Sequence, residues 1–307
     1  MRYGFYTADV FTTRIFGGNP LAVFPDAQGL DARRMQRIAA ELNLSETVFV
    51  FPPEQTGHAR RLRIFTPRAE LPFAGHPTVG CAHVLVHTGA VRLRGETLEL
   101  VFEEGVGPVR VTVRAGGRGE AGSAHLWAPR PLEYGPRAPA RDVLADMLSL
   151  RPSEVLETQS DHPLAISGGV PFLFIPVTGR PALARARLRR DRWETLLADF
   201  WAPHVYVICR EPGDPRAEVR ARMFAPAMGI EEDPATGAAV TALAGYLAPR
   251  EGRREGTVGW RVEQGLEMGR PSLLELEVDL REGAAEAVRV GGASILVSEG
   301  TMEVPDG

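Results

Sequence analysis

The sequence predicts a mixed α/β (α+β) protein of two pseudo-symmetric domains, each a curved mixed β-sheet or barrel wrapped around a central buried helix. Three observations lead to this fold. The chain has 307 residues, which is long for a single hydrophobic core. Several segments alternate between apolar and polar residues, as strands do, and two helical segments are apolar on every side. Finally, a pair of motifs occurs twice, in the same order.

Strands are predicted where apolar and polar residues alternate. Residues 109–114 place valine at every second position between arginine and threonine, and residues 274–280 alternate leucine or valine with acidic residues. Each pattern gives one wet and one dry face, which indicates antiparallel or mixed sheets. The 33 glycines and 25 prolines favour many short elements joined by turns.

Helices of two kinds are predicted. Residues 31–43 and 190–200 have an amphipathic period and suit the surface of a domain. Residues 78–86 and 235–247 have almost no polar face, so each of these helices must be buried on all sides. Their glycines and alanines allow strands to approach closely. We therefore expect a curved sheet around one central helix, twice.

The two halves share sequence motifs. Residues 63–67 and 222–226 both read R-x-F-x-P, and residues 76–82 and 233–239 both read [HD]-P-x-[VT]-G-x-A at the start of an apolar helix. Two matches in the same order indicate a duplication. The alternative is that unrelated strand–turn–helix units converge on such patterns, because glycine and proline often mark helix starts.

The glycine-rich segment 115–122 is the predicted domain boundary. It divides an N-terminal domain, residues 1–117, from a C-terminal domain, residues 123–307. The sequence does not decide whether the last strands of the chain cross back to the N-terminal domain.

Composition excludes several classes of function. The formal net charge of -4 argues against a nucleic-acid partner, which needs a basic surface. The sequence contains no lysine, since all 35 basic residues are arginine, so a Schiff-base lysine and pyridoxal-phosphate catalysis are excluded. No signal peptide or membrane-spanning run is found, and the two cysteines form no CxxC motif. We expect a cytoplasmic protein that does not bind membranes.

Metal binding is not expected. His83 and His87 lie one helical turn apart, which is a spacing that metal ligands use. The sequence offers no third ligand at a recognisable interval, so we interpret both as residues of helix packing or of a helix end.

The two repeated helix starts hold the first candidate functional residues. Pro77 and Pro234 suit the first helical position, which makes His76 and Asp233 the predicted capping residues. Aspartate is a common cap, so a purely structural role for Asp233 is the plain alternative, whereas histidine is a poor cap. Helix N-termini favour negative charge, and two of them across a domain cleft would hold a small anionic metabolite such as a carboxylate.

Glu46 is the candidate general base. It stands at the head of a strongly apolar strand within residues 43–50. The structural alternative is a solvated carboxylate at a strand end. In an apolar cleft, a carboxylate becomes a stronger base and is able to take a proton from carbon.

At these residues the sequence resembles the PhzF-like family of phenazine biosynthesis, within the wider group that has the diaminopimelate-epimerase fold. The resemblance covers nearly the whole chain. It rests on four groups of residues: 9–12 with 18–23, 43–49, 71–78 and 232–237.

The resemblance implies an active site between two domains, no cofactor and a homodimer. It implies that Glu46 is the acid/base glutamate and that His76 and Asp233 are the other catalytic polar residues. The predicted substrate-binding residues, several of them backbone donors, are Asn19, Gly75, Thr236, Gly237 and Ala238.

Two features depart from related proteins. The family often has serine where this chain has Ala238, so a hydroxyl that would hold a substrate carboxylate is missing while backbone donors remain. Related epimerases use one thiol at the entry of each central helix. Cys81 is predicted inside its helix and Cys209 on a strand, which argues against a two-thiol mechanism.

The predicted function is that of a cofactor-independent isomerase. Glu46 would remove a proton from a carbon acidified by a neighbouring unsaturated or carboxyl group and return it on the same face. His76 and Asp233 would orient the substrate. Two alternatives stay open: an epimerase or racemase with Glu46 and Asp233 as opposed bases, and a non-catalytic relative that binds a metabolite or a partner protein.

Overall fold

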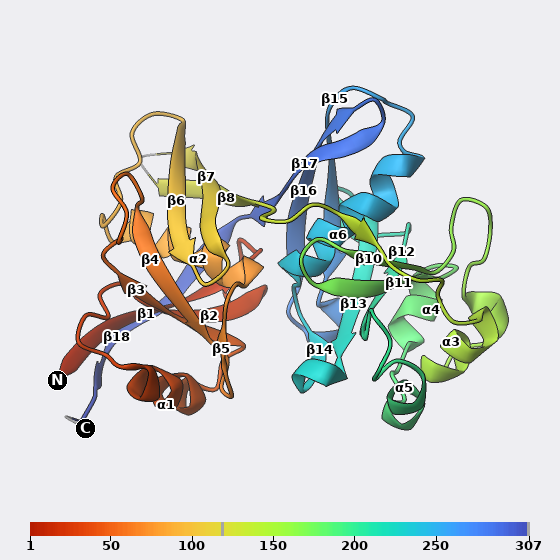
Figure 1. Ribbon diagram of the computed structural model, residues 1–307, viewed down its shortest axis with the longest axis horizontal. Helices are drawn as coiled ribbons and strands as arrows, with labels where there is room; N and C mark the ends of the chain where they lie inside the picture. Colours follow the sequence, from red (N-terminus) through yellow and green to blue (C-terminus); the bar gives the residue numbers. More distant parts are fainter. Residues whose placement is uncertain (118–119, 306–307) are drawn as a thin grey trace. The chain divides into compact units, whose positions relative to one another are not determined.

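The computed structural model describes residues 1–117 and 120–305, apart from the side chains of residues 117, 120 and 121 (Figure 1). Two compact units make up the chain: unit 1 consists of Met1–Pro129 and Gly291–Gly307, and unit 2 of Arg130–Val290. The division falls after Pro129. The boundary expected at residues 115–122 includes residues 118 and 119, which lie outside the described residues. The last strand belongs to unit 1.

Unit 1 is built on a mixed sheet. Its strands are β1 (Arg2–Val10), β2 (Asn19–Phe24), β3 (Glu46–Phe51), β4 (Arg60–Phe65), β5 (Glu70–Leu71), β6 (Thr97–Glu104), β7 (Gly107–Gly117), β8 (Glu120–Trp127) and β18 (Ser294–Glu303). Strand β2 is parallel to β3, and β4 is parallel to β6. The pairs β18–β1, β1–β2, β3–β4, β4–β5, β6–β7 and β7–β8 are antiparallel.

Unit 2 has its own mixed sheet. Its strands are β9 (Glu133–Tyr134), β10 (Leu164–Ser167), β11 (Pro171–Pro176), β12 (His204–Cys209), β13 (Val219–Ala225), β14 (Ile230–Asp233), β15 (Gly256–Gln264) and β16 (Ser272–Arg281), and β17 (Ala284–Gly292) leads back to unit 1. Here β11 is parallel to β12 and β13 to β15, while β10–β11, β12–β13, β13–β14 and β15–β16 are antiparallel.

The predicted duplication is confirmed by this topology. The succession of parallel and antiparallel pairs from β1 to β7 is the same as that from β10 to β16. The R-x-F-x-P motifs end β4 and β13, and their arginines make the same contact in both units. Arg63 donates two hydrogen bonds of 2.6 Å to Glu70, and Arg222 donates two of 2.8 Å to Glu232.

A central helix packs against the strands of each sheet. In unit 1, α2 (Gly75–His87) contacts β1, β2, β3, β7, β8 and β18, and its residues from Gly75 to Val86 are all buried. In unit 2, α6 (Gly237–Leu247) contacts β10, β11 and β16 and is buried except at Ala238. The predicted ranges were 78–86 and 235–247, so α2 begins three residues earlier than predicted and α6 two residues later. Such burial requires a helix without a polar face, as the sequence has.

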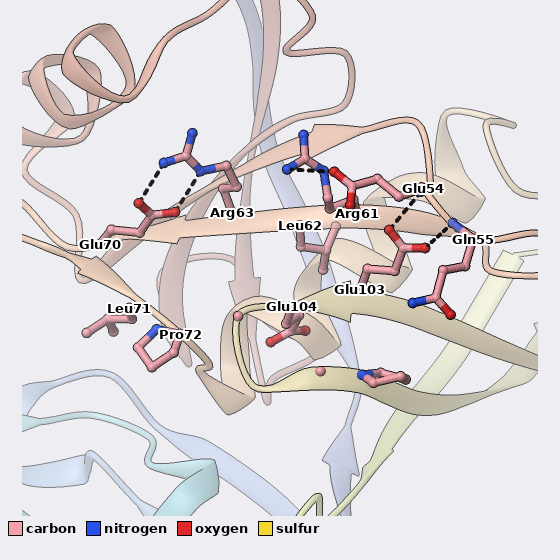
Figure 2. Close-up of a pocket in the computed structure, with 13 residues that line it drawn as sticks. Glu54, Gln55, Arg61, Leu62, Arg63, Glu70, Leu71, Pro72, Glu103 and Glu104 are labelled. Atoms are coloured by element: carbon pink, nitrogen blue, oxygen red, sulfur yellow. Dashed lines mark hydrogen bonds and ion pairs between the residues drawn. The ribbon is translucent and has the colours of Figure 1, made fainter.

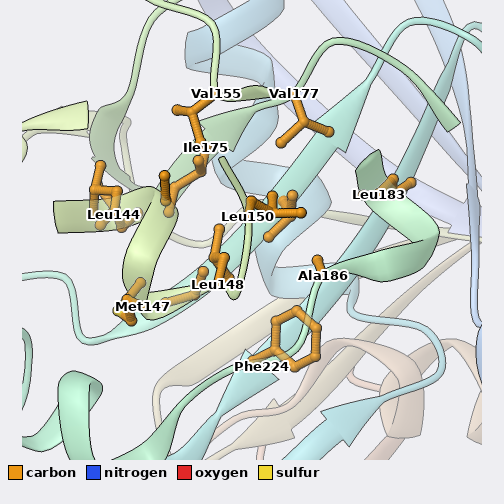
Figure 3. Close-up of a cluster of buried hydrophobic side chains, with 14 of the residues drawn as sticks. Leu144, Met147, Leu148, Leu150, Val155, Ile175, Val177, Leu183, Ala186 and Phe224 are labelled. Atoms are coloured by element: carbon orange, nitrogen blue, oxygen red, sulfur yellow. The ribbon is translucent and has the colours of Figure 1, made fainter. Parts of the chain in front are cut away.

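Outer helices cover the other face of each sheet. In unit 1, α1 (Ala32–Leu42) packs Met35 and Ile38 against Phe65. In unit 2, α3 (Arg141–Met147), α4 (Arg180–Arg185) and α5 (Arg190–Leu196) enclose a core around Phe224, the counterpart of Phe65 (Figure 3). The short 3₁₀ turns are η1 (Pro152–Glu154), η2 (Pro226–Met228), η3 (Ala248–Arg250) and η4 (Leu266–Met268).

The amphipathic helices match their predictions to different degrees. Asp31 caps α1 by accepting the Arg34 N–H at 2.8 Å, and Asn43 ends it in the left-handed conformation, as the range 31–43 predicts. Helix α5 ends at Leu196, before the predicted residue 200, because the Phe200 N–H bonds Leu197 O in a tighter turn. No helix among the described residues is both long and apolar enough to cross a membrane.

Gly80 allows α2 to lie close to the sheet. A Cβ atom at this position would stand 2.6 Å from Leu21 Cδ2 and 2.6 Å from Val10 Cγ2. We predict that Gly80→Ala lowers the free energy of unfolding by ~1–3 kcal/mol, because a well-packed core does not absorb an added methyl group. Urea denaturation measures the change. Gly4→Ala on β1 is the control, since its Cβ meets nothing within 4 Å. Equal stability of the two variants would contradict this packing.

Candidate active site

A glutamate and a histidine meet in the interior of unit 1. Glu46 is the first residue of β3, where it pairs with Leu21 of the parallel strand β2. His76 lies in the first turn of α2. The His76 Nε2 atom is 3.2 Å from Glu46 Oε2, and the two side chains are 7% and 11% exposed. Glu46 and His76, both predicted from the sequence, are therefore neighbours, although 30 positions separate them in the chain.

Burial decides the charge of His76. Loss of hydration lowers the pKa of the imidazole from 6.5 to about 3, so the ring is neutral at neutral pH. The contact with Glu46 therefore joins a neutral imidazole to a carboxyl group. A neutral imidazole has one N–H to donate and one nitrogen that accepts. It can orient a carboxylate or a substrate oxygen, but it carries no extra proton to give away.

Asn19 lies on the same face of the sheet. It opens β2, two residues before Leu21, and is fully buried. Residues two apart in a strand point to the same side, and Leu21 faces α2 because it lies against Gly80. Asn19 and Glu46, whose register partner is Leu21, are thus on the side of the sheet that α2 covers.

The start of α2 differs from the prediction. His76 was expected to be the cap, but the helix begins at Gly75 with Ala74 as its N-cap, so His76 is the second helical residue and Pro77 the third. Proline is tolerated throughout the first turn because no N–H there has a helical partner. The turn is fixed at Ala74, whose carbonyl accepts from Thr78 Oγ1 at 2.8 Å.

Unit 2 fixes Asp233 by hydrogen bonds. This half-buried residue ends β14, and its Oδ2 accepts from Thr236 Oγ1 at 2.5 Å. Gln264 Nε2 donates to Asp233 O at 2.7 Å and to Thr236 Oγ1 at 3.0 Å. The Tyr206 hydroxyl donates to Gln264 Oε1 at 2.9 Å. The aspartate is therefore held at both its backbone and its carboxylate.

The prediction that Asp233 caps α6 is wrong. The helix begins at Gly237, and Thr236 is its N-cap. Side chains from distant strands hold the segment before the helix: Gln264 Nε2 donates to the Asp233 carbonyl at 2.7 Å, and Ser272 Oγ lies 3.0 Å from the Pro234 and Arg270 carbonyl oxygens. The Thr236 carbonyl accepts the first helical bond, from the Val240 N–H.

Each central helix thus begins at a glycine of the predicted set. Gly75 opens α2 and Gly237 opens α6, and neither helix has a side-chain cap at its N-terminus. The first N–H groups of a helix point outward along its axis and carry positive potential. In α6 this turn includes Ala238, which is half-buried while its neighbours are buried. The free N–H groups at these starts suit an anionic ligand.

Sequence reasoning missed Gln264, Tyr206 and Glu104. Each is a buried polar residue whose partners lie far away in the chain. The duplication offered a signal for two of them, because Glu104 and Gln264 follow the two R-x-F-x-P motifs at almost the same distance. Neither residue belongs to a motif by itself.

Other candidate groups lie apart from this arrangement. Cys81 is buried within α2 and Cys209 ends β12, so neither thiol stands at a helix start. His83 Nε2 lies 3.3 Å from Gly292 O, which accounts for its place on α2. In the part of the chain that the structure describes, no three His, Cys, Asp or Glu residues gather as metal ligands do.

Comparison with known proteins places the chain in a family. The family model described as phenazine biosynthesis-like protein matches residues 8–300. The chain belongs to the PhzF family of phenazine biosynthesis-like proteins. The prediction made from the motifs is confirmed.

Relatives of the PhzF family resemble this chain over its whole length. It is 42% identical to an uncharacterized isomerase of Mesorhizobium japonicum, with 96% of each chain covered. It is 36% identical to trans-2,3-dihydro-3-hydroxyanthranilate isomerase of Pseudomonas chlororaphis, over 96% of this chain and 97% of that protein. The predicted enzyme class is confirmed: this PhzF-family chain is an isomerase.

The predicted fold is confirmed as well. The solved structure of a Bacillus anthracis phenazine biosynthesis protein of the PhzF family matches with a TM-score of 0.88 at 24% identity. The match covers 99% of this chain and 100% of that one. The match shows that this chain has the fold of that PhzF-family protein.

The buried state of His76 predicts how stability depends on pH. The unfolded chain protonates this histidine near pH 6.5, whereas the folded chain does so only near its pKa of about 3. The folded state binds fewer protons between these values, so its free energy of unfolding falls as the pH is lowered through this window. His83 and His204, whose pKa values burial lowers to about 4, act in the same direction.

We predict that His76→Asn reduces the loss of unfolding free energy between pH 7 and pH 4 by ~1–3 kcal/mol relative to the native chain. Denaturant unfolding at the two pH values gives the difference. His87→Asn, at the exposed end of the same helix, is the matched control and should leave the loss unchanged. An unaltered pH dependence in His76→Asn would show that this imidazole takes up its proton as readily in the folded protein as in the unfolded chain.

Proposed function

We propose that this PhzF-family isomerase moves a proton along a small, unsaturated, carboxylate-bearing metabolite, without a cofactor, and that Glu46 is the proton carrier. The observation that supports this most is the buried contact of 3.2 Å between Glu46 and the neutral His76. A carboxylate removed from bulk water is a stronger base toward carbon, and the neutral imidazole beside it offers one N–H and one acceptor nitrogen.

In the proposed reaction, the Glu46 carboxylate takes a proton from a carbon that is acidified by the neighbouring π-system or carboxyl group. The electron pair of the broken C–H bond spreads over the conjugated system. The carboxylic acid form of Glu46 then returns the proton to another carbon on the same face. One C–H bond is broken and one is formed, a double bond moves, and no other reagent is consumed. General acid/base catalysis of this kind contributes ~10²–10⁴-fold in rate.

The other predicted residues would bind and orient the substrate. The N–H groups of Gly75 at the start of α2, and of Gly237 and Ala238 at the start of α6, are suited to a carboxylate. Asp233 is held by Thr236 and would accept a hydrogen bond from a substrate amine or hydroxyl. Asn19 is buried on the Glu46 face and offers an amide.

The substrate class follows from a relative. The Pseudomonas chlororaphis enzyme is named for trans-2,3-dihydro-3-hydroxyanthranilate, a cyclic unsaturated amino acid with one carboxylate. We propose a substrate of this class for the present chain. Ala238 lacks the hydroxyl that serine would supply, so the carboxylate would rely on backbone N–H groups at this place.

We predict that Glu46→Gln lowers turnover by ~10²–10⁴-fold and leaves the fold intact, because the amide keeps the shape of the side chain but carries no transferable proton. Proton NMR in deuterium oxide, with trans-2,3-dihydro-3-hydroxyanthranilate as the first substrate, follows both loss of substrate and uptake of deuterium. Glu41→Gln at the exposed end of α1 is the matched control and should behave like the native chain.

The outcomes of this experiment separate the rival functions. Native-like turnover in Glu46→Gln would remove Glu46 from the mechanism. Deuterium uptake at one stereocentre, without movement of a double bond, would assign the chain to epimerisation instead. Binding without any exchange, tested across related cyclic and acyclic carboxylates, would leave a non-catalytic metabolite-binding protein.

A further inference from the structure

Glu104 is a buried carboxyl group that the proposed reaction does not use. It ends β6 and is 8% exposed. It stands on the wall of a cavity of about 540 Å³ in unit 1, next to Pro72 and the turn that begins β7 (Figure 2). Among the described residues, its Oε2 atom is buried without a hydrogen-bond partner. Its Oε1 atom lies 2.7 Å from Thr78 Oγ1.

The Thr78 hydroxyl has two neighbours that can accept a hydrogen bond. It lies 2.8 Å from the carbonyl oxygen of Ala74, the N-cap of α2, and 2.7 Å from Glu104 Oε1. A hydroxyl has one proton, so it can donate to only one of them. If Glu104 is a neutral acid, it donates to Thr78 and Thr78 donates to Ala74. If Glu104 is charged, Thr78 must turn to the carboxylate and Ala74 loses this donor.

The surroundings of Glu104 offer no compensating charge. The two cations that line the same cavity from β4 are paired elsewhere: Arg61 lies 3.3 Å from Glu54, and Arg63 lies 2.6 Å from Glu70. In the described part of the chain, no cation forms an ion pair with Glu104. An unpaired carboxylate in such a place is costly, which favours the neutral acid.

The remaining titratable neighbours also leave the neutral form of Glu104 favoured over the charged form. Glu103, on the same strand, accepts the backbone N–H groups of Glu54 and Gln55 at 2.8 and 2.7 Å. From α2, the Cys81 thiol faces Glu104, and burial raises the pKa of that thiol, so it stays neutral. Arg60 of β4 acts on Cys81 and donates to the carbonyls of Ala59 and Ala90. Burial raises the pKa of Glu104 from 4.5 to about 8.

Unit 2 has a neutral amide at the equivalent place. In the strand register, Arg61 lies opposite Glu103 in unit 1, and its counterpart Arg220 lies opposite Glu263 in unit 2. Glu104 follows Glu103 as Gln264 follows Glu263, so Glu104 corresponds to Gln264. Gln264 likewise ends its strand beneath the start of the central helix and donates to the hydroxyl of Thr236, the N-cap of α6. In both units, a side chain at this strand position therefore contacts a threonine hydroxyl near the start of the central helix.

We propose that Glu104 is a positioning residue that, as a neutral acid, holds the start of α2 and with it His76 through Thr78 and the Ala74 carbonyl. Its effect on turnover rests on the proposed function, whereas its coupling to the helix does not. Ionisation of Glu104 would break the chain of hydrogen bonds two residues before His76. Catalysis would then decline at alkaline pH through a group that does not touch the substrate.

The coupling can be tested on the full chain without substrate. Carbon-13 NMR of glutamate carboxyl groups follows Glu104, which is identified by the signal missing in Glu104→Gln. We expect its midpoint near pH 8, and we expect the backbone amide signals of Gly75 and His76 to move with the same midpoint in the native chain. In Glu104→Gln, where an amide replaces the acid, this movement should be absent. A carboxyl midpoint below pH 6, or helix amides that do not follow it, would overturn the proposal.

Two further variants make the test specific. Thr78→Val should uncouple the helix amides from Glu104 while the carboxyl group still titrates at alkaline pH, and it keeps the proposal testable if Glu104→Gln fails to fold. Glu99→Gln is the matched control, because Glu99 accepts the Thr112 hydroxyl at 2.6 Å on the exposed side of the same strand. It should leave the transition of Gly75 and His76 unchanged. Loss of the transition in Glu99→Gln would count against Glu104.

Turnover distinguishes this proposal from the proposed function. Between pH 7 and pH 9 the native chain should lose about tenfold in kcat, because one pH unit above a pKa of about 8 leaves about a tenth of the acid neutral. Glu104→Gln should change less than about twofold. Equal pH profiles would refute the positioning role. Absence of turnover in both proteins, with the NMR coupling intact, would instead refute the proposed function.

Discussion

The structure depends on burying an entire helix inside a curved sheet. Every residue of α2 from Gly75 to Val86 is removed from water, and α6 is nearly as buried. This burial places the first turn of each helix in the interior of its unit, where the first N–H groups of a helix lack partners within the helix itself. The proposed anion site uses these helix starts. Polar side chains placed near that turn lose hydration, which lowers the pKa of His76 and keeps its imidazole neutral.

The duplication separates the polar contacts that both units share from those that differ between them. Arg63 and Arg222 make the same bidentate contact, and Glu103 and Glu263 each accept two backbone N–H groups from the loop that precedes β4 or β13. These pairs hold the sheet and are the same in both units. The units differ at the helix starts, where His76 corresponds to Asp233. Differences between otherwise equal halves are expected at sites under functional selection.

Much of the fold could be predicted from the sequence, because periodicity and burial are local properties. The alternation in residues 109–114 and 274–280 appears as strands β7 and β16 with alternating burial, and the two apolar helices occupy the centres of the units. The start of α6 was misplaced because the segment before it is held by Gln264, a residue distant in the chain that hydrogen-bonds the Asp233 carbonyl and the Thr236 hydroxyl. Glu46 was identified through a family motif. Glu104 was not identified, because the role proposed for it depends on a contact with the Thr78 hydroxyl of α2 that no sequence motif reveals.

The central claim is that one buried carboxyl group carries the proton from one carbon of the substrate to another. The most direct measurement uses trans-2,3-dihydro-3-hydroxyanthranilate deuterated at the carbon that loses its proton, with turnover in ordinary water and mass spectrometry of the product. Because Glu46 is only 11% exposed, we predict that a measurable share of product molecules keep the deuterium at the new position. Turnover with complete loss of deuterium to water from the first cycle would contradict transport by a single sheltered carboxyl group.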